Sequence, residues 1–208
     1  TILNTTPSDV QKKVLITEFY YYAHPTIHNE FITLYNPTNS SIDLDGWYVT
    51  NTVSKRITDQ KKIIFPKNSV LPEESSITLT QNSSAYYLER LMSPDFEYET
   101  NANQSIPQLS TTSTIYFSNQ GGSIALKDSF NHTIDAISYG NTIINDSYWN
   151  GPSIPETEQG EILKRQKENN SFQDTNTALD WIGSMSYQIG RSTFLPDTYE
   201  LNASITPF

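Results

Sequence analysis

The chain of 208 residues has no cysteine, only three histidines, and 13 Lys+Arg against 23 Asp+Glu, which gives a formal net charge of −10. A domain of this length can bury a core without disulfides, so the missing cysteines leave the cellular compartment open. The deficit of positive charge disfavours nucleic acid as a partner, because nucleic-acid-binding proteins normally present a basic face to the phosphates. The most strongly apolar runs are short, at 14–16 and 63–65. They are far from the ~20 residues that cross a bilayer, so no membrane span is expected.

Aromatic residues make up 12% of the chain, including 13 tyrosines, and this composition favours strands over helices. We therefore predict an all-β domain. The expected strands, from β-branched and aromatic runs bounded by turn residues, are 14–22, 30–35, 41–45, 47–50, 61–66, 76–80, 115–117, 123–127, 133–139 and 161–165.

One short helix is predicted over 85–91, with Ser84 as its cap and Tyr87, Leu88 and Leu91 on a common face. It lies in an insertion of about 84–113, of which 92–113 shows no clear periodicity. The expected organisation is a lead-in over 1–12, a domain over 13–191 and a tail or linker over 192–208.

Asn-x-Ser/Thr sequons are more frequent than the composition predicts. Eight are present, and each is a candidate N-glycan acceptor if the chain is exported. The candidates are Asn4, Asn39, Asn82, Asn103, Asn131, Asn145, Asn169 and Asn202. They favour an extracellular or cell-surface location, and the alternative is a chain that is simply rich in Asn, Ser and Thr.

Five motifs occur in a fixed order along the chain. They are Glu30-Phe31-Ile32-Thr33-Leu34-Tyr35-Asn36-Pro37-Thr38, Ile42-Asp43-Leu44-Asp45-Gly46-Trp47, Phe65-Pro66 with Leu71-Pro72-Glu73, Leu126-Lys127-Asp128 with Ile134-Asp135 and Ser138-Tyr139-Gly140, and Leu163-Lys164-Arg165 with Asp174-Thr175-Asn176 and Asp180-Trp181. Together they resemble the lamin-tail domain family, with Glu73 where that family usually has glycine. The resemblance covers about 13–191 outside the insertion.

The resemblance implies an immunoglobulin-like β-sandwich of about seven to nine strands, with the short helix in the insertion. It also implies that the motif residues are structural, with a glycine at a bulge followed by an aromatic. These residues are Tyr35, Asn36, Pro37, Gly46, Trp47, Asp180 and Trp181.

Candidates for chemistry are few. His24, His28 and His132 are the only histidines, and none accompanies a Gly-x-Ser-x-Gly elbow, so no catalytic residue is assigned. His24 and His28 are four residues apart, but Pro25 prevents the helix that would align them on a metal.

Two groups of polar and acidic residues are candidate cation sites. Asp174, Asn176 and Asp180 could offer alternate oxygens to Ca²⁺, but the glycine and distal glutamate of an EF-hand loop are missing. A turn cap at Asp174 or Asn176, with Asp180 binding backbone amides, is the favoured interpretation, and no cofactor is expected. The alternating Asp95, Glu97 and Glu99 are interpreted as solvated charge.

These features predict a non-catalytic extracellular attachment or interaction module, with a protein or cell-surface polymer as partner. The family resemblance also suggests an alternative: an accessory domain of a secreted phospholipase D-like phosphodiesterase or nuclease whose catalytic part lies beyond Phe208. The basic residues Lys55, Arg56, Lys61, Lys62 and Lys67 lack interleaved aromatics, which disfavours nucleic acid. Sheet edges could pair two copies of the chain.

Overall fold

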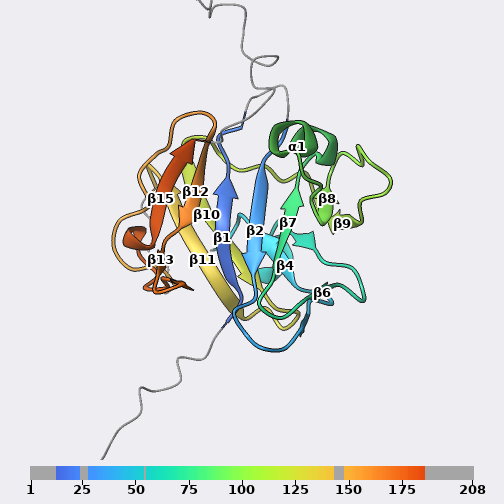
Figure 1. Ribbon diagram of the computed structural model, residues 1–208, viewed down its shortest axis with the longest axis horizontal. Coiled ribbons are helices and arrows are strands. Elements are labelled where there is room, and N and C mark those ends of the chain that lie inside the picture. The colour runs from blue at the N-terminus through green and yellow to red at the C-terminus, as the bar shows by residue number, and fades with distance from the viewer. Residues whose placement is uncertain (1–12, 24–27, 54, 143–147, 186–208) are drawn as a thin grey trace, which may run out of the picture.

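A computed structural model describes residues 13–23, 28–53, 55–142 and 148–185. The lead-in over 1–12, the whole of the expected tail over 192–208, His24, and the sequons at Asn4, Asn145 and Asn202 lie outside these residues. Within the described part, the chain is built on one curled sheet of eleven strands, with a single α-helix at one end (Figure 1).

The sheet is ordered β11-β10-β4-β5-β9-β8-β7-β2-β1-β12-β15. From one edge to the other, its strands are β11 (Thr133–Gly140), β10 (Gly121–Lys127), β4 (Tyr48–Thr50), β5 (Ile63–Ile64), β9 (Gln108–Thr111), β8 (Phe96–Tyr98), β7 (Ser76–Thr80), β2 (Phe31–Tyr35), β1 (Leu15–Tyr20), β12 (Glu161–Arg165) and β15 (Trp181–Met185). Two small two-stranded sheets lie outside it. One pairs β3 (Ile42–Asp43) with β6 (Val70–Leu71), and the other is the hairpin of β13 (Lys167–Glu168) and β14 (Ser171–Phe172). The remaining elements are α1 (Ser83–Arg90) and the short 3-10 helices η1 (Ile57–Asp59) and η2 (Ala178–Asp180).

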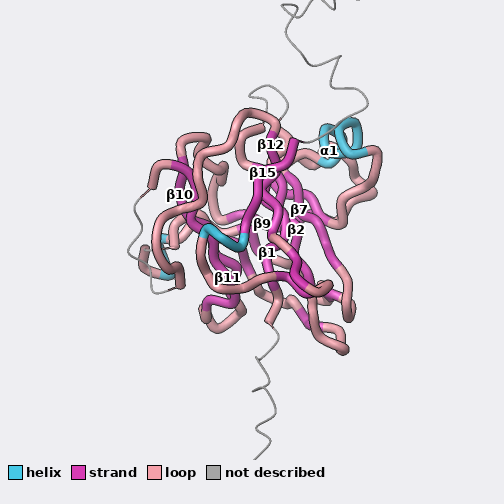
Figure 2. Tube along the Cα trace, turned by 60° about the vertical axis from the view of Figure 1, so that its left-hand side comes forward, coloured by secondary structure: helices cyan, strands magenta, loops and turns pink. Residues whose placement is uncertain are grey.

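The curled sheet encloses one main core. Side chains from both halves meet there, with Ile16 and Phe19 of β1 in the same buried cluster as Ile124 of β10 and Ile137 of β11. The ring of Phe19 stacks edge-on against Phe117 and Tyr139, with centroids 5.0 and 4.9 Å away. Figure 2 shows β10 and β11 on one side of this core and β1, β2 and β7 on the other.

The all-β class is confirmed, but the sheet differs from the expected one. Eleven strands form a continuous hydrogen-bonded order, instead of about seven to nine strands in two separate sheets. The cause is the insertion, where β8 pairs in parallel with β7 on one side and with β9 on the other. β9 then pairs with β5, so that a segment interpreted as irregular joins the two halves.

One further strand prediction needs correction, and other strands were not predicted. The expected strand at 115–117 is an irregular segment in which Ile115 and Phe117 are buried and Tyr116 is exposed. The backbone N–H of Phe117 donates to the Glu30 carboxyl group instead of a neighbouring strand. β15 and the hairpin β13–β14 were not predicted at all.

The helix forms where expected, but the residue that packs it against the sheet is not on the predicted apolar face. α1 is capped by Asn82, whose side-chain oxygen accepts from the Ala85 N–H at 3.0 Å, and it ends where Leu91 turns left-handed at φ 55°. Tyr86 packs edge-on against Phe31 at 5.2 Å and buries this side of the helix. The predicted face of Tyr87, Leu88 and Leu91 is therefore exposed to solvent.

Candidate functional site

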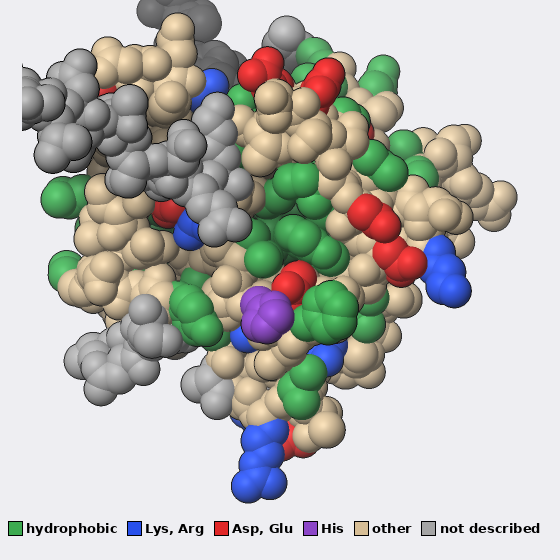
Figure 3. Space-filling model, turned by 90° about the horizontal axis from the view of Figure 1, so that it is seen from below, with side chains coloured by type: hydrophobic (Ala, Val, Ile, Leu, Met, Phe, Trp, Pro, Cys, Tyr) green, Lys and Arg blue, Asp and Glu red, His purple; other side chains and the backbone are tan. Residues whose placement is uncertain are grey.

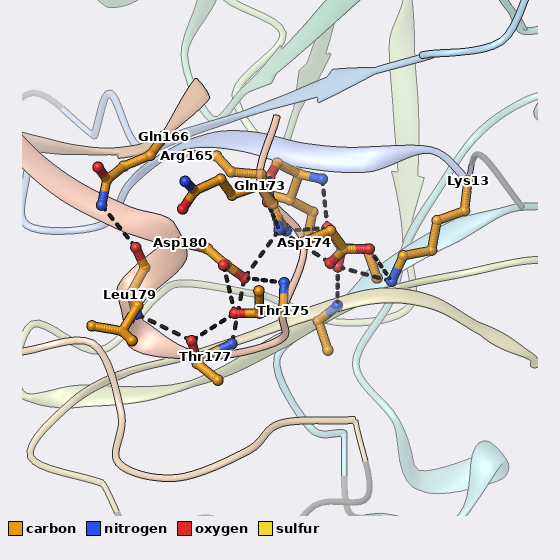
Figure 4. Close-up of polar contacts among 12 residues, drawn as sticks. Lys13, Arg165, Gln166, Gln173, Asp174, Thr175, Thr177, Leu179 and Asp180 are labelled. Carbon is orange, nitrogen blue, oxygen red and sulfur yellow. Dashed lines mark hydrogen bonds and ion pairs between the residues drawn. The ribbon is translucent and has the colours of Figure 1, made fainter. Parts of the chain in front are cut away.

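The last of the five sequence motifs converges on the guanidinium of Arg165, which is 1% exposed (Figure 4). Its Nη2 donates to the Asp135 carboxylate at 2.6 Å, its Nη1 to Asp174 at 3.3 Å, and its Nε to the backbone oxygen of Ile16 at 2.7 Å. The Asp180 carboxylate lies 3.7 Å away. We call Arg165, Asp135, Asp174 and Asp180 the Arg165 cluster.

Each carboxylate of the cluster also has partners of its own. Asp135 is fully buried and accepts the backbone N–H of Ile16 at 2.7 Å. Burial raises the pKa of Asp135, and the charges of Arg165 and Lys13 lower it in part. Lys13 also pairs with Asp174 at 3.1 Å. The cluster therefore ties the first described strand to the middle and the end of the fold.

Asp180 and Asn176 stabilise the turn before β15. The side chain of Asp180 accepts the backbone N–H of Thr175 at 2.8 Å and closes a capping box with Thr177 around η2. Asn176 has a left-handed backbone at φ 55°, and its carbonyl accepts the Asn150 N–H. The three candidate calcium ligands are thus divided: two carboxylates surround Arg165, and Asn176 lies in the turn.

The other motif residues hold loops. The buried Asn36 side chain donates to the backbone oxygens of Ser40 at 2.8 Å and Pro72 at 3.0 Å, and accepts the N–H of Thr38 at 3.0 Å. It thereby fixes the loop that begins at Pro37. Tyr35 packs edge-on against Phe172, with centroids 5.1 Å apart.

The glycine and tryptophan motif residues also have local structural roles. Gly46 turns the chain at φ 70°, in the left-handed region that favours glycine, and Trp47 packs partly buried on the core. Trp181 is 5% exposed, and the Arg165 guanidinium lies 4.8 Å from its ring centroid.

The sequence analysis missed two buried carboxyl groups. Glu97 was interpreted as solvated, but it is fully buried and accepts from the backbone N–H groups of Ser83 and Ala102 at 3.1 and 2.9 Å. Burial raises its pKa, but hydrogen bonds from Thr100, Ala102 and Ser83 outweigh that effect and lower it overall. These bonds tie the insertion to the start of α1.

Glu30 is the second of these groups. Burial raises its pKa to about 8, although its hydrogen bond with the Phe117 N–H opposes the shift. Burial and the nearby Glu30 raise the pKa values of Tyr98 and Tyr139 as well. The only sequence signal for Glu30 was its place at the start of the first motif.

The described sequons differ in accessibility. Asn39, Asn103 and Asn169 are exposed, and Asn169 lies in the turn of the β13–β14 hairpin. Asn82 and Asn131 are half-buried and engaged, since Asn82 caps α1 and the Asn131 side chain accepts from the Tyr48 hydroxyl group.

The basic residues of the 55–67 stretch make individual contacts. Lys61 lies over the ring of Tyr116 at 5.5 Å and Lys62 over that of Tyr48 at 4.5 Å. On the face in Figure 3, basic side chains lie singly between acidic, polar and apolar ones. That face offers no block of positive charge to a polyanion.

The remaining histidines lie apart from the Arg165 cluster in the sequence and in their contacts. His132 has an exposed side chain that pairs with Asp128 at 2.8 Å, and His28 precedes β2 in a left-handed conformation at φ 52°. In the described part of the chain, no three His, Asp or Glu side chains are grouped so that they could hold a metal ion. No described helix is both long and apolar enough to cross a membrane.

Comparisons with known proteins agree with this architecture. A crystal structure of a DUF4876 family protein from Bacteroides thetaiotaomicron superposes with a TM-score of 0.60 at 16% identity, covering 86% of this chain and 73% of that one. No curated protein matches the sequence. The family model of the lamin tail domain matches residues 7–141, well over half of the chain. Such a match suggests a non-catalytic immunoglobulin-like module. Because the match covers more than half of the chain, the chain belongs to the lamin tail domain family.

Proposed function

We propose that the chain is a non-catalytic attachment module that acts outside the cell. The observation that carries the proposal is the Arg165 cluster. Its charged residues, which are the motif residues able to bind a ligand or take part in catalysis, pair with one another in the interior. Glu97 is likewise held by backbone amides. Groups engaged in this way stabilise a scaffold, so function falls to the exposed surface.

The accessible sequons support a location outside the cell. Asn39, Asn103 and Asn169 have exposed side chains on loops or turns, which is where glycans are attached. Asn131 is less suited, because its side chain is half-buried and bonded to the Tyr48 hydroxyl group. A glycoprotein from this sequence should therefore be modified at the first three sites before Asn131.

Intact mass spectrometry of the protein purified from its native host tests the location. We expect a mass above that of the polypeptide, resolved by glycosidase treatment and peptide mapping into additions at Asn39, Asn103 and Asn169. The mass of the bare polypeptide, which is 23.6 kDa for these 208 residues, would remove the main support for export.

Attachment is tested separately with washed cell envelopes of the host. The fluorescently labelled full chain should co-sediment with the envelopes in a saturable manner, and excess unlabelled chain should compete. The same chain unfolded by heat is the control for non-specific adsorption. A folded chain that sediments no better than the heated one would contradict the proposal.

A further inference from the structure

An open groove crosses the outer face of the sheet between the end of α1 and the β13–β14 hairpin. Its volume is about 450 Å³, within the ~300–1,000 Å³ range of sites that hold small organic ligands. Its floor is formed by β7, β2, β1 and β12, which are neighbouring strands of the sheet. We call it the sheet groove.

The floor is a row of polar side chains across these strands. Lys164 of β12 is paired with Glu18 of β1, Glu18 with Thr33 of β2, and Thr33 with Thr78 of β7. The hydroxyl groups of Thr33 and Thr78 are 3.0 Å apart, and the Thr33 hydroxyl group donates to Glu18 at 3.3 Å. This face of the sheet is therefore hydrophilic where the helix does not cover it.

The walls of the groove come from two separate elements. On one side, Arg90 and Met92 at the end of α1 overhang the floor, above the buried Tyr86. On the other side stand Lys167 and Phe172 of the β13–β14 hairpin. The groove therefore offers hydroxyl groups below, and both charge and apolar surface at the sides.

The charge of the groove is opposite to that of the molecule. Among the described residues that line it, four are basic and only Glu18 is acidic, whereas the whole chain carries −10. The charge of Arg165 is compensated by Asp135. Arg90 and Lys164 approach Glu18 only to 3.9 and 3.8 Å, beyond hydrogen-bond distance. Arg90 also bonds the Tyr86 side chain, but a guanidinium carries five N–H donors, so both residues retain donors for a ligand.

We propose that the sheet groove binds an acidic polysaccharide whose sugar rings carry carboxylates. The proposal deepens the attachment function above and rests on it. Sugar hydroxyl groups suit Thr33, Thr78 and the accepting carboxylate of Glu18, and the ligand's carboxylates suit the cations. The ring of Phe172 adds apolar surface at the wall of the groove, where Tyr35 packs against it and the Lys167 ammonium group lies 4.3 Å from its centroid.

Glu18 distinguishes this ligand from a phosphodiester polymer. Its carboxylate stands in the floor between the cations, where it would repel a continuous row of phosphates. A polyuronate instead presents hydroxyl groups between its charges, and these can donate to Glu18. Single-stranded DNA is therefore the discriminating competitor.

Isothermal titration of the full chain with sodium polygalacturonate tests the proposal, with neutral dextran and single-stranded oligo-dT as comparison polymers. We expect saturable binding of polygalacturonate, weakened by added salt, and no measurable binding of dextran. Tighter binding of oligo-dT than of polygalacturonate, or no binding of polygalacturonate at low salt, would overturn the proposal.

A charge-matched pair of double variants locates the site. Arg90→Gln with Lys164→Gln removes two cations from the groove, and we expect the dissociation constant to rise by about tenfold or more. Lys55→Gln with Arg56→Gln removes the same two residue types from the exposed 55–67 stretch and should leave binding near the wild-type value. Equal losses in both variants would show attraction by charge alone and would contradict a site in the groove.

Arg90 also packs 5.5 Å from the ring of Phe31, so its replacement could disturb the helix. Lys164→Gln alone avoids this, because the Lys164 side chain is 39% exposed. We expect this single variant to melt as the wild type does and to bind polygalacturonate about threefold more weakly. Unchanged binding in this folded variant would count against the groove.

The envelope assay separates the two proposals. If the chain binds envelopes but not polygalacturonate, and the groove variant still sediments with them, the attachment proposal stands and the groove proposal fails. If the chain binds neither, both fail. If it binds both and the groove variant loses both together, both are supported.

Discussion

At the residue scale, Arg165 is the residue on which the stability of the fold depends most. Its guanidinium neutralises the fully buried Asp135 and bonds the backbone oxygen of Ile16. Replacing one partner of a buried ion pair leaves the other charge without compensation, which costs about 3–5 kcal/mol. We expect Arg165→Met to lower the free energy of unfolding by this amount, as measured by urea denaturation at pH 7.

The control is the same substitution at an exposed arginine. Arg56→Met should change the free energy of unfolding by less than about 0.5 kcal/mol, since Arg56 lies on the surface. A similar small change in Arg165→Met would mean that the cluster contributes little to stability.

Glu30 makes the free energy of unfolding depend on pH. Its pKa is about 8 in the fold and 4.5 ordinarily, so the folded state holds this proton more tightly than the unfolded state. The stabilisation is therefore complete below about pH 4.5 and is lost as pH rises through 8, by at most about 1.4 kcal/mol per pH unit. Glu30→Gln should flatten this decline and be the more stable protein at pH 8.5.

Urea denaturation at pH 5, 6.5 and 8.5 measures the difference. The exposed Glu73→Gln is the matched control and should follow the wild type at all three pH values. Parallel curves for Glu30→Gln and the wild type would contradict a raised pKa at Glu30.

At the scale of elements, Glu97 connects the insertion to the helix. Its carboxylate accepts from Ser83 at the start of α1 and from Ala102 in the loop after β8. In Glu97→Gln, the amide NH₂ cannot accept, so at least one buried donor loses its partner at a cost of about 1–3 kcal/mol. We expect faster hydrogen exchange at Ser83 and Ala102, while β10 and β11 remain protected.

Glu73→Gln is the control for this prediction, because Glu73 is exposed in the turn between β6 and β7. It should leave the exchange of Ser83 and Ala102 unchanged. Equal acceleration in both variants, or acceleration throughout the sheet, would show that Glu97 has no specific role in joining the insertion to α1.

The elements found from sequence are those with a strong local pattern. The β-branched and aromatic runs at 30–35 and 76–80 were predicted as strands, and they form β2 and β7. β8 and β9 have only three and four residues, and they are held by parallel pairing with β7 and with each other and by antiparallel pairing of β9 with the distant β5. A local pattern carries no signal for such pairing.

The Arg165 cluster illustrates the same limit. Its residues were recognised as parts of a family motif, but not as one assembly. Arg165 lies 30 residues from Asp135 and 149 from Ile16, and nothing in a single sequence reports contacts over such separations. The exposed face of α1 was misleading for a related reason, because helical spacing identifies an apolar face without saying whether another element covers it.

At the scale of the whole molecule, the net charge of −10 opposes compaction through self-repulsion. Added salt screens exposed charges, whereas the buried Arg165 pairs are screened far less. We expect the melting temperature to rise by a few degrees between 10 and 300 mM ionic strength. Asp174 and Asp180 are paired with Arg165, so we expect them not to form a calcium site. CaCl₂ and NaCl at equal ionic strength should therefore raise the melting temperature equally.

Differential scanning calorimetry after EDTA treatment makes this comparison, with MgCl₂ as a control for divalent charge. A rise specific to CaCl₂ would establish a calcium site and contradict the equality. Its loss in Asp174→Asn, with Asp59→Asn as an exposed control, would assign that site to the turn before β15.

The long reach of Arg165 also bears on the timing of synthesis. The guanidinium that binds the backbone oxygen of Ile16 is made 149 residues after Ile16 itself, and Asp180 later still. At about 5–20 residues per second, roughly 7–30 s pass before the sheet can close. Throughout that interval β1 has no β12 to pair with, so the nascent polypeptide remains open to chaperones or to a translocation channel.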